Sequence, residues 1–299
     1  MLDVILRKQV CFMEMILLAL LPALMWGSIP LIVSKVGGKP IQQLIGTTIG
    51  AMIMATVIAL VFRPEFTTLA IVTGFISGAF WALGQYLQFQ SFQILSVSKA
   101  MPISTGMQLV GTSLFGVIVL GDWQTSTELW LGFSALVLII IGATMTSYQQ
   151  KKDQDSAGAL KKGLLVLFVS SIGYVTYAVL TNYFEVEGIT AILPQSVGMF
   201  IAALLFSLRE KDVKKLDPRT FKNILAGLAW GIGNFGLFVS SGEVGIATSF
   251  ALSQLNVVVA TLGGIYLLKE EKTTKERVFV FMGIGLIVVA GFMLGIAKS

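Results

Sequence analysis

Histidine is absent from the sequence, and cysteine occurs once, as Cys11. Without histidine the chain cannot form a Ser-His-Asp triad, and it lacks the commonest metal ligand. A single cysteine cannot close an internal disulfide. The sequence also lacks a glycine-rich phosphate loop ending in Lys-Ser or Lys-Thr, and its carboxylates lie mostly at the ends of apolar segments rather than in pairs within them. We therefore predict no enzyme, no metal site and no cofactor.

Charged residues are also scarce, at 12% of the chain, whereas hydrophobic residues make up 55%. A soluble domain usually carries about a quarter charged residues. Apolar runs recur from Met15 to Ala297, and about 20 such residues cross a bilayer as one helix. A chain of 299 residues therefore has room for about ten spans and no separate soluble domain. We predict an all-α integral membrane protein in the lipid bilayer, with spans at 14–34, 41–62, 68–90, 100–120, 128–147, 163–183, 189–208, 223–241, 246–268 and 277–297.

The longest polar connector, 148–162, divides the chain nearly in half. We expect residues 1–13 to form a short N-terminal leader. Residues 14–147 then hold the first five spans, and residues 163–299 hold the last five.

The net charge of +5 comes from Lys and Arg in the loops between apolar runs. This placement favours a role in membrane orientation over a nucleic-acid partner, so we predict no nucleic acid. With ten spans, Arg7, Lys8, Arg63 and Lys298 share the side of both termini, and all other Lys and Arg residues lie on the opposite side. Because cytoplasmic loops collect Lys and Arg, we expect both termini outside the cytoplasm.

An internal repeat relates the two halves. The segment Gly78–Ser91 aligns without gaps on Gly227–Ser240, and five of the fourteen positions are identical, among them Trp81 with Trp230. Five spans per half is an odd number, so the halves must have opposite orientations. The sequence therefore predicts two inverted five-helix repeats, an arrangement common in transporters.

Polar side chains inside the spans indicate the chemistry. An unpaired amide in hydrocarbon costs several kcal/mol, so such groups face partners or a wet cavity. Amides offer paired donors and acceptors to sugar hydroxyls, and a tryptophan face stacks on the C–H surface of a sugar. The alternative is that serines bond their own backbone and tryptophans only pack. The candidate substrate-binding residues are Trp26, Trp81, Gln85, Gln88, Ser104, Gln108, Trp230, Asn234, Ser253 and Gln254.

Several motifs together resemble the glucose/ribose porter family of the drug/metabolite transporter superfamily. The resemblance implies uptake of a neutral monosaccharide across a bacterial plasma membrane, driven by protons. The stretch 34–40 resembles ribose members, whereas 81–85 and 101–108 resemble glucose members, so the sugar stays open between the two. The motifs are Trp26–Ser28, Gly37–Pro40, Ile45–Gly50, Trp81–Gln85, Ser98–Gly111, Pro194–Gly198 and Ala247–Gln254.

Proton symport needs a titratable group in the pathway. The nearest candidates are Glu14, Asp122 and Glu243, all at predicted span ends. Facilitated diffusion without protons is therefore an alternative. Two further alternatives are a metabolite or drug exporter of the same superfamily and a membrane-embedded enzyme or sensor. The sequence makes no prediction of oligomeric state.

Overall fold

The computed structural model of the chain describes residues 2–148, 150, 154–244, 249 and 252–297. Within these, residues 2–16, 154–156 and 242–244 are described by their backbone alone.

The described chain is built from helices, and it contains no strand. Nine of its helices are long and apolar enough to cross a membrane, and α11 is a shorter apolar helix. The predicted all-α membrane fold is therefore confirmed. The elements are α1 (Leu2–Val36), α2 (Pro40–Phe62), α3 (Thr68–Leu95), α4 (Val97–Phe115) with a π-helical end (Gly116–Leu120), α5 (Ser126–Thr146), α6 (Gln154–Tyr183), α7 (Gly188–Ser207), α8 (Pro218–Lys222), α9 (Ile224–Val244), α11 (Asn256–Tyr266) and α12 (Thr274–Ala297).

Two helix starts differ from the prediction. Helix α1 begins within the expected leader 1–13, and α6 begins at Gln154, inside the expected connector 148–162. Hydropathy locates only the apolar part of a helix, which in α6 begins at Ala157. The additional turns continue the same backbone hydrogen bonding into the polar region.

The ninth predicted span, 246–268, is interrupted. Part of it lies outside the described residues, and the rest shows a turn at 254–255 before α11 begins at Asn256. The N–H groups of Val257 and Val258 each donate to the carbonyl three residues earlier, rather than four. A hydropathy count does not detect such a break, because the apolar residues on both sides outweigh the polar Ser253, Gln254 and Asn256 in the average.

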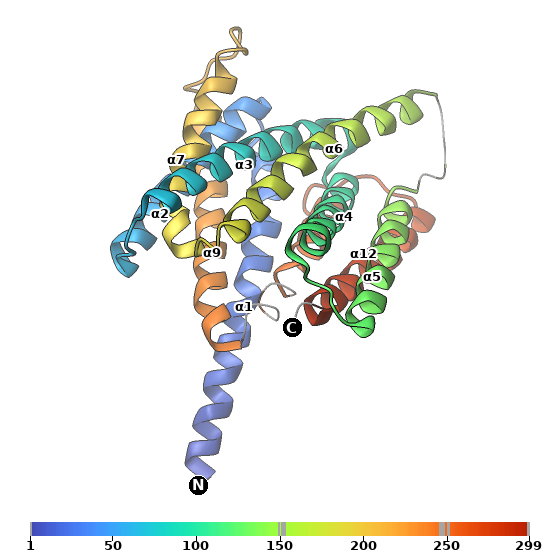
Figure 1. Cartoon of the computed structure of the whole chain (residues 1–299). Helices are drawn as coiled ribbons and strands as arrows, with labels where there is room; N and C mark the ends of the chain where they lie inside the picture. The colour runs from blue at the N-terminus through green and yellow to red at the C-terminus, as the bar shows by residue number, and fades with distance from the viewer. Residues whose placement is uncertain (1, 149, 151–153, 245–248, 250–251, 298–299) are drawn as a thin grey trace.

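Long-range helix pairs hold the molecule together (Figure 1). Helix α1 packs along α9, α3 along α6, and α5 along α12. Helices α3 and α7 cross tightly, as do α2 and α9. At these crossings a Cβ atom at Gly78 would overlap the carbonyl of Gln195, and a Cβ atom at Gly227 would overlap that of Thr47. The absence of a side chain therefore allows direct backbone contact between the helices.

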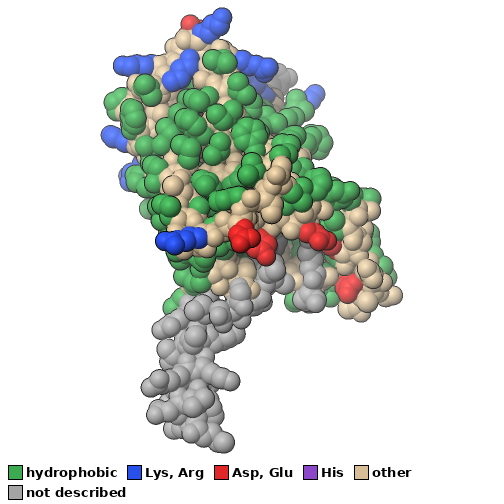
Figure 2. Space-filling model, turned by 60° about the vertical axis from the view of Figure 1, so that its left-hand side comes forward, with side chains coloured by type: hydrophobic (Ala, Val, Ile, Leu, Met, Phe, Trp, Pro, Cys, Tyr) green, Lys and Arg blue, Asp and Glu red, His purple; other side chains and the backbone are tan. Residues whose placement is uncertain are grey.

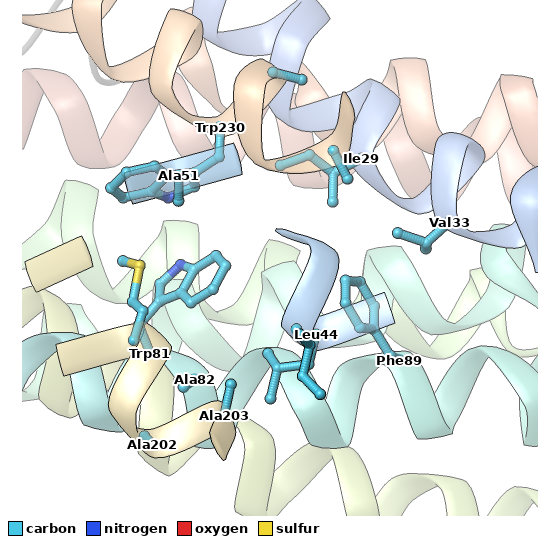
Figure 3. Close-up of a cluster of buried hydrophobic side chains, with 14 of the residues drawn as sticks. Ile29, Val33, Leu44, Ala51, Trp81, Ala82, Phe89, Ala202, Ala203 and Trp230 are labelled. Atoms are coloured by element: carbon cyan, nitrogen blue, oxygen red, sulfur yellow. The ribbon is translucent and has the colours of Figure 1, made fainter. Parts of the chain in front are cut away.

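A buried apolar cluster lies between α1, α2, α3, α7 and α9 (Figure 3). At its centre the rings of Trp81 and Trp230 meet with centroids 5.7 Å apart and planes inclined by 63°. Ile29, Leu44 and Phe89 pack in the same cluster, each at most 5% exposed.

Hydrophobic side chains cover the middle of the molecule, and charged side chains gather at its two ends (Figure 2). One end, the basic end, carries Lys35 in the last turn of α1 and the loops that contain Lys39, Lys214 and Lys272. Among the described residues, Arg7, Lys8 and Arg63 are the only lysines and arginines toward the opposite end, because the helices alternate in direction.

We predict that Gly78→Ala and Gly227→Ala each destabilise the protein, because the new Cβ atom meets backbone that cannot rotate away. Overpacking of this kind costs about 1–3 kcal/mol. The midpoint of thermal unfolding in detergent, followed by fluorescence-detected size exclusion, measures the effect. Gly285→Ala is the matched control, because nothing lies within 4 Å of its Cβ position. Equal midpoints for all three variants would contradict the prediction.

Candidate functional site

A cavity of about 320 Å³ lies where α1, α3, α4, α6, α7, α9 and the start of α11 meet. Its volume is at the lower end of the range for ligand pockets, which suits a small solute. None of the lining residues in the described chain is Asp, Glu, Lys or Arg. The polar and aromatic lining residues are Trp26, Trp81, Gln85, Gln88, Thr105, Gln108, Thr112, Tyr174, Tyr177, Thr181, Gln195, Trp230, Asn234, Phe238, Gln254 and Asn256.

A larger groove, of about 690 Å³, lies between α4, α5 and α6. It is lined mainly by aliphatic side chains, and lining residues such as Ile140 and Phe168 are more than half exposed on the membrane-facing surface. Among its described lining residues there is no amide side chain. Its chemistry fits contact with lipid, so the smaller polar cavity is the candidate site.

A hydrogen-bonded amide network forms the wall from α3 and α4. Gln85 Nε2 donates to Gln88 Oε1 at 3.2 Å, and Gln88 Nε2 donates to Ser104 Oγ at 2.7 Å. Gln108 Nε2 also donates to Ser104 Oγ, at 3.0 Å, and the Tyr174 hydroxyl donates to Gln88 Oε1 at 3.0 Å. The spacings 85/88 and 104/108 put each pair on one helix face.

Two acceptor oxygens of this network remain available to a bound solute. Gln88 has both ends of its amide engaged. Within the described part of the chain, no group donates to Oε1 of Gln85 or of Gln108, and neither oxygen is fully enclosed. Because both residues line the cavity, these two oxygens can accept hydrogen bonds from a bound solute.

The opposite wall comes from α9 and the interrupted helix. Asn234 Nδ2 donates to the Trp230 carbonyl at 2.8 Å, which fixes the amide over its own helix. Gln254 Nε2 donates to Ser253 Oγ at 3.2 Å, and Asn256 Nδ2 donates to the Ser253 carbonyl at 2.8 Å. At the turn at 254–255, the Ser253 carbonyl therefore has a side chain, that of Asn256, as its hydrogen-bond donor. The amides of Gln254 and Asn256 both line the cavity.

The tryptophans differ in how much surface they offer. Trp81 and Trp230 are each 3% exposed and largely cover one another. Trp26 is only half-buried, and its Nε1 donates to the Trp230 carbonyl at 3.2 Å. Its indole lies over Gly233, where a Cβ atom would overlap the ring. Trp26 is therefore the tryptophan best placed to offer a ring face to a solute.

The profile of a family described as sugar transport protein matches residues 17–297. This chain belongs to that family. It is 52% identical to a putative sugar uptake protein of Listeria monocytogenes, over 95% of this chain and 99% of the relative. With the same coverage of both chains, it is 49% identical to the glucose uptake protein GlcU of Bacillus subtilis and 47% identical to a probable glucose uptake protein GlcU of Priestia megaterium.

The family consists of transporters, which confirms the prediction that the chain is not an enzyme. A solved crystal structure with 13% sequence identity matches with a TM-score of 0.62, covering 96% of this chain and 99% of the other. At that identity the likeness shows the fold alone.

In this sugar transport family member, eight of the ten predicted site residues line the cavity. The other two, Ser104 and Ser253, lie behind the wall, are fully buried and accept hydrogen bonds from the lining amides. Tyr174 and Gln195 line the cavity but were not in the predicted set. Both are polar residues within spans, and that signal could have included them.

The carboxylates proposed for proton coupling are not part of the described wall. Asp122 lies in the loop between the π-helical end of α4 and α5 and does not line the cavity. The side chains of Glu14 and Glu243 lie outside the described residues. No cluster of His, Cys, Asp or Glu suited to a metal ion occurs in the described chain.

Proposed function

We propose that the chain is a permease that takes up a neutral monosaccharide, with glucose as the first candidate. The observation that carries the proposal is the cavity of amides, hydroxyls and a tryptophan face without a charged residue in its described wall. Relatives that match nearly the full chain are named glucose uptake proteins, which favours glucose over ribose.

The wall chemistry fits a polyhydroxylated solute. A sugar hydroxyl both donates and accepts, so it can donate to Gln85 Oε1 or Gln108 Oε1 and accept from a neighbouring group. Ser104 holds Gln108 from behind, and Gln88 holds Gln85, so the acceptors are positioned before the sugar arrives. An exporter of cationic drugs would instead need a carboxylate in the wall, and the described wall has none.

We also propose that transport works by alternating access between two inverted repeats. In support, equivalent contacts occur in pairs: α1 with α9 corresponds to α6 with α3, and α2 with α9 corresponds to α7 with α3. The aligned glycines Gly78 and Gly227 make equivalent close approaches, to the carbonyls of the aligned residues Gln195 and Thr47. Rocking of one group of helices against another about a central site is the usual mechanism of such folds.

The cavity wall reaches toward the end opposite the basic end. Its wall includes Thr181 near the end of α6, Gly188 at the start of α7 and Phe238 near the end of α9, all toward the end opposite the basic end. Toward the basic end, the Tyr86 hydroxyl donates to Glu210 Oε1 at 2.8 Å. If the basic end faces the cytoplasm, as the positive-inside rule predicts, this conformation is closed to the cytoplasm.

Gln85→Ala and Gln108→Ala should each lower sugar uptake about tenfold or more, because each change removes a hydrogen-bond acceptor from the site. Radiolabelled glucose and ribose uptake, in a host that lacks its own systems for both, measures this. Gln93→Ala is the control, since Gln93 is exposed on the same helix. Normal uptake in both variants, at normal membrane abundance, would show that this cavity is not the sugar site.

A protonophore should abolish accumulation of the sugar if transport is coupled to protons, as the family resemblance implies. The variants Glu14→Gln, Asp122→Asn and Glu243→Gln then identify the carboxylate, because its loss should prevent accumulation while downhill exchange continues. Uptake that ignores the protonophore and all three substitutions would establish facilitated diffusion, which the uncharged described wall would explain.

A reporter fused after Ser299 should be inactive if it works only in the cytoplasm, because ten spans put both termini at the end opposite the basic end. The same reporter in the connector near Gln150, at the basic end, should be active. Activity at Ser299 would refute the orientation.

A further inference from the structure

The carboxylate of Glu270 binds the first backbone N–H groups of α4. Oε1 accepts from the Val97 N–H at 2.7 Å, and Oε2 accepts from the Ser98 N–H at 3.0 Å. The first N–H groups of a helix have no partner within the helix, and a carboxylate there forms charge-assisted hydrogen bonds. Glu270 is far from Val97 and Ser98 in the sequence, so the contact is a clamp between the loop after α11 and the start of α4.

The loop after α11 is shaped to bring Glu270 to this position. The Leu268 N–H donates to the Gly263 carbonyl at 3.0 Å, and the Glu270 N–H donates to the Gly264 carbonyl at 3.2 Å. Lys269 between them takes a left-handed conformation with φ of 55°. A Cβ atom at Gly264 would lie 3.0 Å from the Ser98 nitrogen and 3.2 Å from Glu270 Oε2, so glycine leaves the room that the contact needs.

This clamp joins two groups of helices that face each other across the cavity. Helix α4 packs on α6, which packs on α3, whereas α11 packs on α1, which packs on α9; the two groups meet where α4 packs directly on α11. The cavity takes Gln85 and Gln108 from the first group and Trp230 and Asn234 from the second. The clamp lies at the basic end, away from the side toward which the cavity extends. It therefore crosses the interface that must separate if the basic end opens.

The surroundings of the clamp offer alternative partners. Lys99 on α4, Lys272 in the same loop and Glu276 on α12 interact electrostatically with one another, and both lysines interact with Glu270. Burial lowers the pKa of the Lys272 ammonium, and the two carboxylates oppose that shift. The Ser98 hydroxyl is fully buried and has no partner among the described residues. The closed arrangement thus carries the cost of an unsatisfied hydroxyl, which water would relieve on opening.

We propose that Glu270 is a gating residue, a latch that holds the basic end shut and positions α4 against α11 in the transport cycle. This inference rests on the proposed function for its role in transport, but the latch itself is a contact that needs no sugar. Loss of the carboxylate shifts the population toward the state open at the basic end.

The test compares Glu270→Gln with Glu271→Gln, which removes the same charge from an exposed neighbour. In a Cys11→Ser background, Ser98→Cys places a thiol beside the latch while keeping the backbone donors. An impermeable thiol reagent, applied to the basic end in membrane vesicles of known orientation, should label this cysteine roughly tenfold faster in Glu270→Gln than in Glu271→Gln, because two charge-assisted hydrogen bonds are lost.

A second reporter separates a gate from simple destabilisation. Thr181→Cys, in the cavity wall toward the opposite end, should label more slowly from that end in Glu270→Gln, because alternating access opens one end at the expense of the other. A loosened protein would label faster at both positions, and that result would overturn the proposal. Equal labelling of Ser98→Cys in both glutamine variants would also overturn it.

Gly264→Ala provides an independent route to the same outcome if Glu270→Gln does not reach the membrane. The added Cβ atom crowds the Glu270 carboxylate and the Ser98 nitrogen. Labelling should therefore again become faster at Ser98→Cys and slower at Thr181→Cys. Sugar uptake by the unmodified protein is measured separately. Its absence would refute the sugar permease and leave the latch result standing, whereas normal uptake with unchanged labelling would refute the latch alone.

Discussion

Direct backbone contact at two helix crossings determines the arrangement of the site. At Gly78 on α3 and Gly227 on α9, the chain approaches the carbonyls of Gln195 and Thr47 so closely that a side chain has no room. Trp81 and Trp230 follow three residues after these glycines and therefore lie on the same helix faces. The crossings thus bring the two indoles together in the core, and the amides one turn further, Gln85 and Asn234, reach the cavity.

The second constraint is the cost of amide groups within a membrane. Each buried amide must find partners, and here they are Ser104, which lies behind the wall, and Tyr174, which lines the cavity beside the amides. Ser104 accepts from Gln88 and Gln108, and Tyr174 donates to Gln88. Both ends of the Gln88 amide therefore have partners, whereas the side-chain oxygens of Gln85 and Gln108 accept no hydrogen bond from the described residues. A polar site in this fold is therefore stabilised by the same hydrogen bonds that orient it for a hydroxylated ligand.

The sequence predicted what depends on composition and local spacing. Hydropathy located the helices, and the spacing of amides on α3 and α4 identified one wall of the cavity. The sequence pattern did not rank Tyr174 or Gln195 above other polar residues in spans. Their roles arise from contacts between distant segments, of Tyr174 with Gln88 and of Gln195 with Ser77. The turn at 254–255 was missed because the apolar residues on both sides outweigh the polar Ser253, Gln254 and Asn256 in a hydropathy average. Glu270 escaped notice because its partner is backbone, which carries no residue-specific pattern.

Charged side chains are distributed differently in the proposed site and at the two ends of the molecule. The described cavity wall is uncharged, so a neutral solute bound there would leave no ion unpaired in a medium of low polarity. The charged contacts lie at the ends, where water can solvate whatever is released when a contact breaks. Tyr86 with Glu210 and α4 with Glu270 both lie at the basic end, whereas the cavity extends to the other. In the proposed transport cycle, a few contacts at the ends can therefore set the free-energy difference between open and closed states, while the proposed sugar site keeps one geometry suited to binding.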